Sequence, residues 1–387
     1  MLFRGWGESV DGAWPDVATV VDHVGVRHLV VTRHALVRRL LTDPATFRPD
    51  NALDAVTPLP VAALRVLAGH RFRLPPTLAN NATASHPEIR GIVAGALHPD
   101  RVAAQQPWLT GLVRRRVARL AAALDAGAPV DLYADLAADL PLLVLARLVE
   151  LPDAPVTAVK DFAQAALELF WAPLDEPRQL ALAAEVGRFH TVLRAFAADG
   201  GGLAARLRAA GHSPDVVVGA LFFLLVAGQE TTSQFLTLLL HRLTAEPAVR
   251  AGLRTGAVEV ADVVEEGLRL EPPIVTWRRV AAVDTSLGGT AVPAGTSIVA
   301  WLARAGRDPE VVAAPDGFVP GQRGSRRHLA FGAGPHRCVG AQLARMEAAV
   351  VVAEAAPLLD GVTVVRPPWC PDNLTFRMPD AFVIRRA

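Results

Sequence analysis

Cysteine is scarce in this chain of 387 residues, which has only Cys338 and Cys370. Small secreted domains that depend on disulfides carry many more cysteines, so this content gives no sign of an oxidising compartment. A zinc site would need two or three further cysteine or histidine ligands at metal-binding spacing, and neither cysteine has them. The sequence therefore argues against a disulfide framework and against structural zinc.

The chain also lacks an excess of charge of either sign. Its 39 basic and 38 acidic residues leave a formal net charge of +1. No nucleic-acid partner is expected, because such partners require an extended basic surface. Lysine is almost absent: Lys160 is the only one, so nearly all positive charge is arginine. Nothing in the sequence explains this bias.

Long apolar runs, linkers and repeats are missing as well. The longest apolar run, at 216–226, is about half the roughly 20 residues that a membrane span needs, so we expect a core helix there and no membrane anchor. Residues 1–6 show no apolar stretch of the signal-peptide type. No Ser/Gly linker, charge run or internal repeat divides the chain. We therefore expect one domain over residues 1–387, located in the cytoplasm.

The composition that is present favours helices. Alanine, leucine, arginine and glutamate are abundant, while Val/Thr-rich stretches are short. We predict a strand at 28–32 and a pair of strands, 280–287 and 290–301, around the Gly288-Gly289 turn. The predicted fold class is mainly α with small β-sheets.

Cys338 lies in the most distinctive segment of the chain. Residues 331–340 read Phe-Gly-Ala-Gly-Pro-His-Arg-Cys-Val-Gly, and a helical pattern follows at 341–356. A thiolate at a helix N-terminus is stabilised by the macrodipole, which predicts a lowered thiol pKa. Glycines let backbone approach a flat ligand closely, and one thiolate offered from a tight turn suits a haem iron.

Three other interpretations of Cys338 remain open from the turn alone. A lone cysteine is usually a small buried hydrophobe. It can also be a catalytic thiol, although His336, two residues away on a turn, is badly placed to act as its base. A disulfide with Cys370 is the third.

The segment resembles the cysteine-ligand loop of the cytochrome P-450 family, in the Phe-Gly-x-Gly-x-His-x-Cys-x-Gly form of soluble bacterial members. Further family signatures occur in order from about residue 28 to the C-terminus. The resemblance implies the cytochrome P-450 fold, with haem b between a long central helix and this loop, and with Cys338 as the axial ligand of the iron. It also implies a first helix near residues 13–24.

A polar motif interrupts the central apolar segment. Helical residues from 216 to 243 would span roughly 42 Å at 1.5 Å per residue. The interruption, Ala227-Gly228-Gln229-Glu230-Thr231-Thr232, is costly inside a buried helix, since Gly and Thr are weak helix formers and a buried carboxylate needs a partner. The resemblance implies that Gly228 makes room beside the haem, Thr231 hydrogen-bonds dioxygen and Glu230 relays protons.

Glu266 and Arg269 are spaced to share one helix face and to pair. A surface pair of this kind contributes little, but the resemblance implies the buried structural ion pair of a Glu-x-x-Arg helix. Family members often have arginine or histidine just before the Phe of the following loop. Here Gly317 precedes Phe318, which leaves the third partner unidentified.

Four cations match family positions that bind haem propionates, since carboxylates attract charged donors: His86, Arg90, Arg279 and His336. The full cofactor-binding set that the resemblance implies is His86, Arg90, Ala227, Arg279, Phe331, Gly332, His336, Cys338 and Gly340.

The family's pocket-forming segments supply the candidate substrate residues, which are Leu78, Asn80, Asn81, Phe223, Val275, Thr276 and Thr375. They are mainly apolar with a few amides and hydroxyls. Such a lining favours an uncharged or weakly polar, medium-sized molecule, such as a secondary metabolite. Asn80 and Asn81 can equally be turn residues that contact no ligand.

The resemblance implies a haem-thiolate monooxygenase that acts as a monomer on a small organic molecule. Because no flavin or ferredoxin segment follows the haem region, NAD(P)H electrons are expected through a separate ferredoxin reductase and ferredoxin. Basic residues around the cysteine loop would attract the ferredoxin: Arg323, Arg326, Arg327, Arg337 and Arg345. The alternatives are family members that catalyse aryl coupling, desaturation or peroxide-driven oxidation, and a haem-thiolate sensor or carrier without turnover.

Overall fold

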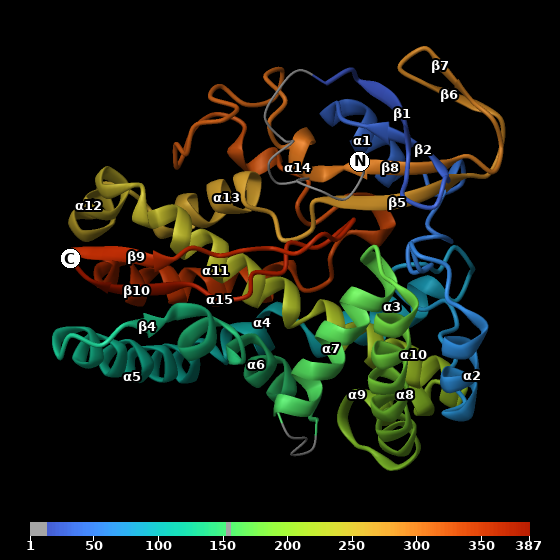
Figure 1. Cartoon of the computed structure of the whole chain (residues 1–387), viewed down its shortest axis with the longest axis horizontal. Coiled ribbons are helices and arrows are strands. Elements are labelled where there is room, and N and C mark those ends of the chain that lie inside the picture. The colour runs from blue at the N-terminus through green and yellow to red at the C-terminus, as the bar shows by residue number, and fades with distance from the viewer. Residues whose placement is uncertain (1–13, 152–155) are drawn as a thin grey trace.

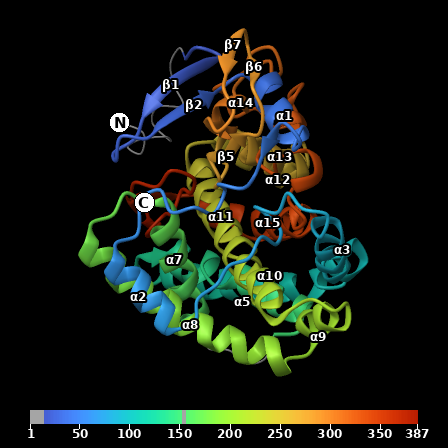
Figure 2. The same cartoon turned by 90° about the vertical axis from the view of Figure 1, so that its right-hand side faces the viewer.

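The computed structural model describes residues 14–151 and 156–387. Figures 1 and 2 show a small β region at the top and a larger body of helices below it, with two consecutive helices passing through the middle. These are α10 (Pro214–Ala227) and α11 (Glu230–Thr244). The prediction of a mainly α fold with small sheets is confirmed.

The described chain contains three sheets. The largest has the strand order β1-β2-β8-β5-β3, in which β2 and β8 run parallel and the other neighbours antiparallel. A second sheet has the order β4-β10-β9, and β6 and β7 form a hairpin. The strands are β1 (Val17–Val21), β2 (Arg27–Val31), β3 (Phe47–Arg48), β4 (Val130–Asp131), β5 (Thr276–Ala281), β6 (Thr285–Leu287), β7 (Thr290–Val292), β8 (Ser297–Trp301), β9 (Val362–Arg366) and β10 (Val383–Arg386).

Helices account for most of the remaining elements. Those before the central pair are α1 (His34–Thr42), α2 (Val61–Gly69), α3 (His86–Ala96), α4 (Pro99–Ala103), α5 (Gln106–Asp125), the π-helix η1 (Tyr133–Ala137), α6 (Leu140–Val149), α7 (Val156–Trp171), α8 (Glu176–Asp199) and α9 (Gly202–Ala209). Those after it are α12 (Pro247–Thr255), α13 (Val260–Leu270), α14 (Leu302–Ala305), α15 (Ala341–Ala355) and the short 3₁₀ turns η2 (Ser325–Arg327), η3 (Gly334–His336) and η4 (Ala356–Leu359).

The predicted strand at 28–32 is β2. Of the predicted pair, 280–287 contains the end of β5 and all of β6, and 290–301 contains β7 and β8. The second of these is divided by a turn at Gly295, whose φ of 82° bends the chain.

The helix predicted at 13–24 is wrong. Residue 13 lies outside the described residues, and Val17–Val21 forms β1, which pairs antiparallel with β2. Its sequence, Val-Ala-Thr-Val-Val, is rich in β-branched residues, which favour a strand when a partner strand is available. The partner comes back through a turn at Gly25, where φ is 88°.

The central helix is broken where the sequence places its polar motif. Residues Gly228 and Gln229 separate α10 from α11. A Cβ on Gly228 would lie 2.7 Å from the carbonyl oxygen of Leu224 and 3.0 Å from the Leu145 side chain. The Gly228 position therefore admits only glycine without a shift of backbone.

One stretch of the described chain, Pro214–Thr244, is long and apolar enough by composition to cross a bilayer. Of its most apolar window, 72% is buried within the protein. Packing in the core accounts for this hydropathy, as expected for the apolar run at 216–226.

Glu266 and Arg269 form a fully buried ion pair on α13, with exposed fractions of 0% and 1%. The guanidinium donates to both Glu266 oxygens, at 2.8 and 2.9 Å. It also donates to backbone carbonyls, which are those of Gly306, Ala314, Pro315 and Gly317. The third side-chain partner is Gln322, whose amide donates to Glu266 Oε1 at 2.5 Å. A neutral amide therefore completes the pair, and Gly317 contributes a carbonyl.

Replacing Arg269 by methionine leaves the Glu266 carboxylate buried without its cation. We expect the free energy of unfolding to fall by about 3–5 kcal/mol, the usual cost of breaking a buried pair from one side. The control is Arg326→Met, which removes the partly exposed contact with Asp262 and should cost about 1 kcal/mol or less. Urea unfolding followed by circular dichroism compares the two; equal midpoints would contradict a bracing role for Arg269.

Candidate functional site

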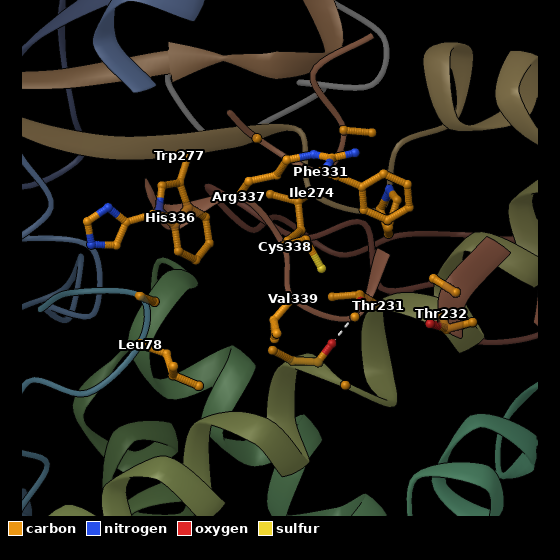
Figure 3. A pocket seen from close by; sticks show the side chains of 18 of the residues that line it. Leu78, Thr231, Thr232, Ile274, Trp277, Phe331, His336, Arg337, Cys338 and Val339 are labelled. Atoms are coloured by element: carbon orange, nitrogen blue, oxygen red, sulfur yellow. Dashed lines mark hydrogen bonds between the residues drawn. The ribbon is translucent and has the colours of Figure 1, made fainter. Parts of the chain in front are cut away.

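A cavity lies between the α10–α11 break and the loop that carries Cys338 (Figure 3). The Cys338 sulfur points into this space, and Thr231 lies across it. On the α10–α11 side the cavity is lined by Phe223, Leu224, Ala227, Gly228, Thr231, Thr232 and Phe235. The cysteine-loop side supplies Ala330, Phe331, Gly332, Ala333, His336, Arg337, Cys338, Val339, Gly340, Leu343 and Ala344.

The loop is shaped by short-range backbone contacts. The Cys338 N–H donates to the Phe331 carbonyl at 2.8 Å, which closes the turn. Gly334 has a φ of 70°, and a Cβ there would lie 2.5 Å from the Leu41 carbonyl oxygen. Glycine is thus required at this point for conformation and for space. The helix α15 begins at Ala341, as predicted.

Burial raises the pKa of the Cys338 thiol, although the Gly340 N–H and Arg90 oppose that shift. The lowered pKa predicted from the helix N-terminus is therefore wrong for the protein alone, because desolvation outweighs the Gly340 N–H and the nearby arginines. Cys370 is also a free thiol, so the disulfide interpretation is excluded. Burial raises the pKa of Cys370 to about 11, and it does not line the cavity.

A second ion-pair cluster holds the start of the cysteine loop. Arg345 on α15 lies over the Phe331 ring, 4.5 Å from its centre, and donates to both oxygens of Glu265. His328 contacts the same carboxylate at 3.1 Å. Burial opposes ionisation of Glu265, but His328 and Arg345 bring its pKa down to about 2. Arg345 is therefore an internal brace of the loop.

Polar groups gather at one edge of the cavity. Arg279, Arg90 and His336 line it, and His86 stacks on His336 with ring centres 4.3 Å apart. His336 Nε2 lies 2.9 Å from the Asn81 carbonyl, which leaves its Nδ1 buried without a partner in the described chain. The His86 Nε2 is in the same situation.

Arg279 is the strongest indication of an anionic ligand. It is 2% exposed and donates to the Arg278 carbonyl at 2.8 Å, but no carboxylate within residues 14–151 and 156–387 pairs with it. Burial lowers its pKa to about 10. A buried cation of this kind requires an anion to be stable. Carboxylates at this edge, with a flat ring between Cys338 and Thr231, fit the groups present, and haem has that combination.

Glu230 and Thr231, which are predicted to relay protons and to hydrogen-bond dioxygen, face different directions. Thr231 lines the cavity, and its hydroxyl donates to the Ala227 carbonyl at 2.7 Å (Figure 3). Glu230 is 1% exposed and does not line the cavity. Its Oε1 lies 2.5 Å from the Lys160 ammonium and accepts from the Gln229 amide at 3.0 Å.

In the sequence, Lys160 is distinctive only because it is the single lysine. The ammonium also donates to Gln229 Oε1 at 3.0 Å, so Lys160, Gln229 and Glu230 form a closed set of contacts between α7 and α11. A carboxylate is buried here because the single lysine compensates its charge. The polar motif alone did not identify this partner.

The predicted substrate residues separate into two groups. Leu78 and Phe223 line the cavity. Five other predicted residues do not line the cavity, and their predicted positions are corrected: Asn80, Asn81, Val275, Thr276 and Thr375. The two asparagines accept turn hydrogen bonds from Thr77 and Thr83, which is the alternative considered above.

Alternation along β5 explains the correction for Thr276. Side chains alternate along β5, so residues two apart share a face. Trp277 and Arg279 line the cavity, whereas Thr276 points away and donates to the Leu374 carbonyl at 2.5 Å. Val275 is packed in a core cluster with Trp301. Trp277 was missed, although the prediction for Arg279 and the period of two would have identified it.

Comparisons with known proteins find relatives that match most of this chain. Residues 207–355 match the family model "Cytochrome P450". The chain is 30% identical to erythromycin C-12 hydroxylase of Saccharopolyspora erythraea, over 89% of this chain and 85% of that protein. It is 31% identical to cytochrome P450 GfsF of Streptomyces halstedii, over 83% and 77%. The solved structure of cytochrome P450 CREJ with (4-ethylphenyl) dihydrogen phosphate superposes with a TM-score of 0.89, at 26% identity, over 95% and 94%.

Replacing Cys338 by serine should abolish the red-shifted absorption band that ferrous thiolate-ligated haem shows with carbon monoxide. The matched control is Cys370→Ser, which should keep the band because Cys370 lies outside the cavity. Absorption spectra of the two reconstituted variants provide the measurement. Loss of the band in the Cys370 variant together with its retention in the Cys338 variant would reverse the assignment.

Proposed function

Because the chain belongs to the cytochrome P450 family and is a P450 monooxygenase, we propose that it inserts one oxygen atom of O2 into an apolar or weakly polar organic substrate, by hydroxylation or epoxidation. The observation that carries the proposal is that Cys338 and Thr231 face one cavity from opposite sides. Its relative erythromycin C-12 hydroxylase supports hydroxylation of a secondary metabolite. We take residues 1–387 as one haem domain.

Cys338 would hold the haem, which would supply the oxygen-activating chemistry when bound. Arg279, Arg90, His336 and His86 would bind its propionates, since they bring cationic or unpartnered groups to one edge. Gly228 would leave room beside the haem, and a side chain at this position would clash with the Leu224 carbonyl. Thr231 would hold a proton at its hydroxyl on the cavity side, with Glu230 as the acid behind it.

The substrate side of the cavity is almost wholly apolar. Its lining away from the basic edge includes Leu78, Ala79, Leu145, Phe223, Leu224, Pro273, Ile274 and Trp277. Because Asn80 and Asn81 are engaged in turns, shape and apolar contact would orient the substrate. A small multiply charged metabolite would bury its charges there without partners. The proposed substrate is therefore an uncharged molecule of medium size.

Electrons would come from NAD(P)H through a ferredoxin reductase and a ferredoxin, in the cytoplasm. Near the cysteine loop, Arg323, Arg327 and Arg337 are exposed, whereas Arg345 is engaged with Glu265. Arg326 is exposed as well and pairs with Asp262 at 2.8 Å. This surface would attract an acidic ferredoxin.

Thr231→Ala tests the proposed chemistry. With a surrogate ferredoxin and reductase, the variant should bind haem and substrate normally but yield at least about tenfold less product per NAD(P)H, because general acid–base steps are typically worth 10²–10⁴-fold. The missing equivalents should appear as peroxide or water. Product and peroxide are both quantified. Coupling equal to that of the parent protein would count against Thr231, and absence of any oxygenated product from the parent would count against the proposed reaction.

The basic surface should make the rate of reduction by ferredoxin depend on salt concentration. Added salt should slow reduction by ferredoxin, since the Debye length is about 10 Å at 0.1 M. A double variant, Arg323→Glu with Arg327→Glu, should slow it further and weaken the salt dependence. Arg65→Glu on α2 is the control on another element. If the stopped-flow rate of reduction changes neither with added salt nor in the double variant, this docking surface is ruled out.

A further inference from the structure

In the proposed function, on which this inference rests, Glu230 supplies protons to the cavity. It must then receive protons from solvent. The carboxylate is 1% exposed and is fixed to Lys160 and Gln229. Lys160 is itself only 9% exposed. Neither the carboxylate nor its ion-pair partner therefore meets bulk solvent freely, and a route from the surface is required.

Tyr133 lies at the outer end of the same polar region. It is the only tyrosine of the chain and the first residue of the π-helix η1, where it is partly exposed. Its hydroxyl accepts a hydrogen bond from the Gln164 amide at 2.9 Å. Gln164 lies one turn after Lys160 on α7, so the two side chains share a face. The charge of Glu230 contributes, after burial, to the raised pKa of Tyr133.

Gln234 supplies an independent observation. It lies one turn after Glu230, on the same face of α11, and is 2% exposed. Neither its amide nitrogen nor its amide oxygen has a hydrogen-bond partner within residues 14–151 and 156–387. Buried amides are almost always satisfied, and ordered water is the usual partner when protein groups are absent. The helix α11 packs against η1, which carries Tyr133.

We propose that solvent protons reach Glu230 from the η1 side, through the Tyr133 hydroxyl and a water molecule bound by Gln234. One proton passes from solvent water to the Tyr133 oxygen while the hydroxyl proton moves inward to the bound water. That water passes a proton to Glu230, which gives one up toward Thr231. No electron is transferred, and every oxygen regains its starting protonation.

The remaining contacts explain why the route is fixed. Gln164 donates to the Tyr133 oxygen and therefore leaves the hydroxyl proton free to point elsewhere. Lys160 holds the Glu230 carboxylate in place, and Gln229 bonds to both of them. Lys160, Gln164, Gln229 and Gln234 are positioning residues in this route, whereas the Tyr133 hydroxyl and the water bound by Gln234 carry the mobile protons.

The test uses the holoenzyme with substrate and a surrogate ferredoxin system. Tyr133→Phe removes only the hydroxyl, and Gln234→Leu removes only the water-binding amide. Each should slow turnover about tenfold, below the 10²–10⁴ range of a direct acid, and should enlarge the solvent deuterium isotope effect. Substrate affinity from the spin-state titration should stay unchanged. Asp161→Asn, at an exposed position on α7, is the matched control and should retain the parent values.

A second readout does not depend on turnover. Fluorotyrosine labels a single site in this chain, so its fluorine resonance reports on Tyr133 alone. Gln234→Leu and Glu230→Gln should both shift that resonance, and Asp161→Asn should not.

Parent-like rates and isotope effects in both Tyr133→Phe and Gln234→Leu would overturn the route. If Thr231→Ala still uncouples in the same assays, the proposed function stands without it. A fluorine resonance that is insensitive to Glu230→Gln and Gln234→Leu would also overturn the route, whatever reaction the enzyme catalyses.

Discussion

The buried guanidinium of Arg269 is the constraint on which the cavity depends. It binds Glu266 and carbonyls of two loop segments that have no regular structure of their own, at Gly306 and at 314–317. Removing a cation from water costs several kcal/mol, so the arrangement is stable only with these partners in place. From residue 317 the chain passes through η2 and continues into residues 331–340. The cation therefore fixes where the Cys338 loop begins, and the contact between Arg345 and Phe331 fixes how it continues.

Features encoded by neighbouring residues could be predicted from the sequence. The start of α15 at Ala341, the interruption at Gly228 and the strand β2 follow from local glycines, apolar periodicity and β-branched residues. The structure also brings the predicted basic residues to one cavity edge. The error at 17–21 arose because the helix was placed by the resemblance, whereas the β-branched residues there pair with β2 and form a strand. The substrate residue predicted on β5, Thr276, was misplaced by one position from Trp277, and a shift of one residue turns a side chain to the opposite face of a sheet.

Partners that are distant in sequence could not be predicted. Gln322 meets Glu266, and Lys160 meets Glu230, only because α7 packs near α11 and the loop after α14 folds back over α13. No period or spacing in the sequence encodes such a contact. In both cases the unmet charge was visible in the sequence, since a buried carboxylate demands compensation. The sequence could thus predict that a buried charge needs a partner. Only the packing of the helices and loops shows which residue that partner is.

The buried position of Lys160 has a further consequence for chemical modification. Reagents that acylate surface ε-amino groups have no lysine to attack at the protein surface, because the single one is 9% exposed and ion-paired with Glu230. Acylation at Lys160 must wait for α7 to separate from α11. The rate of amine labelling at this one residue therefore measures the local opening of the contact between α7 and α11.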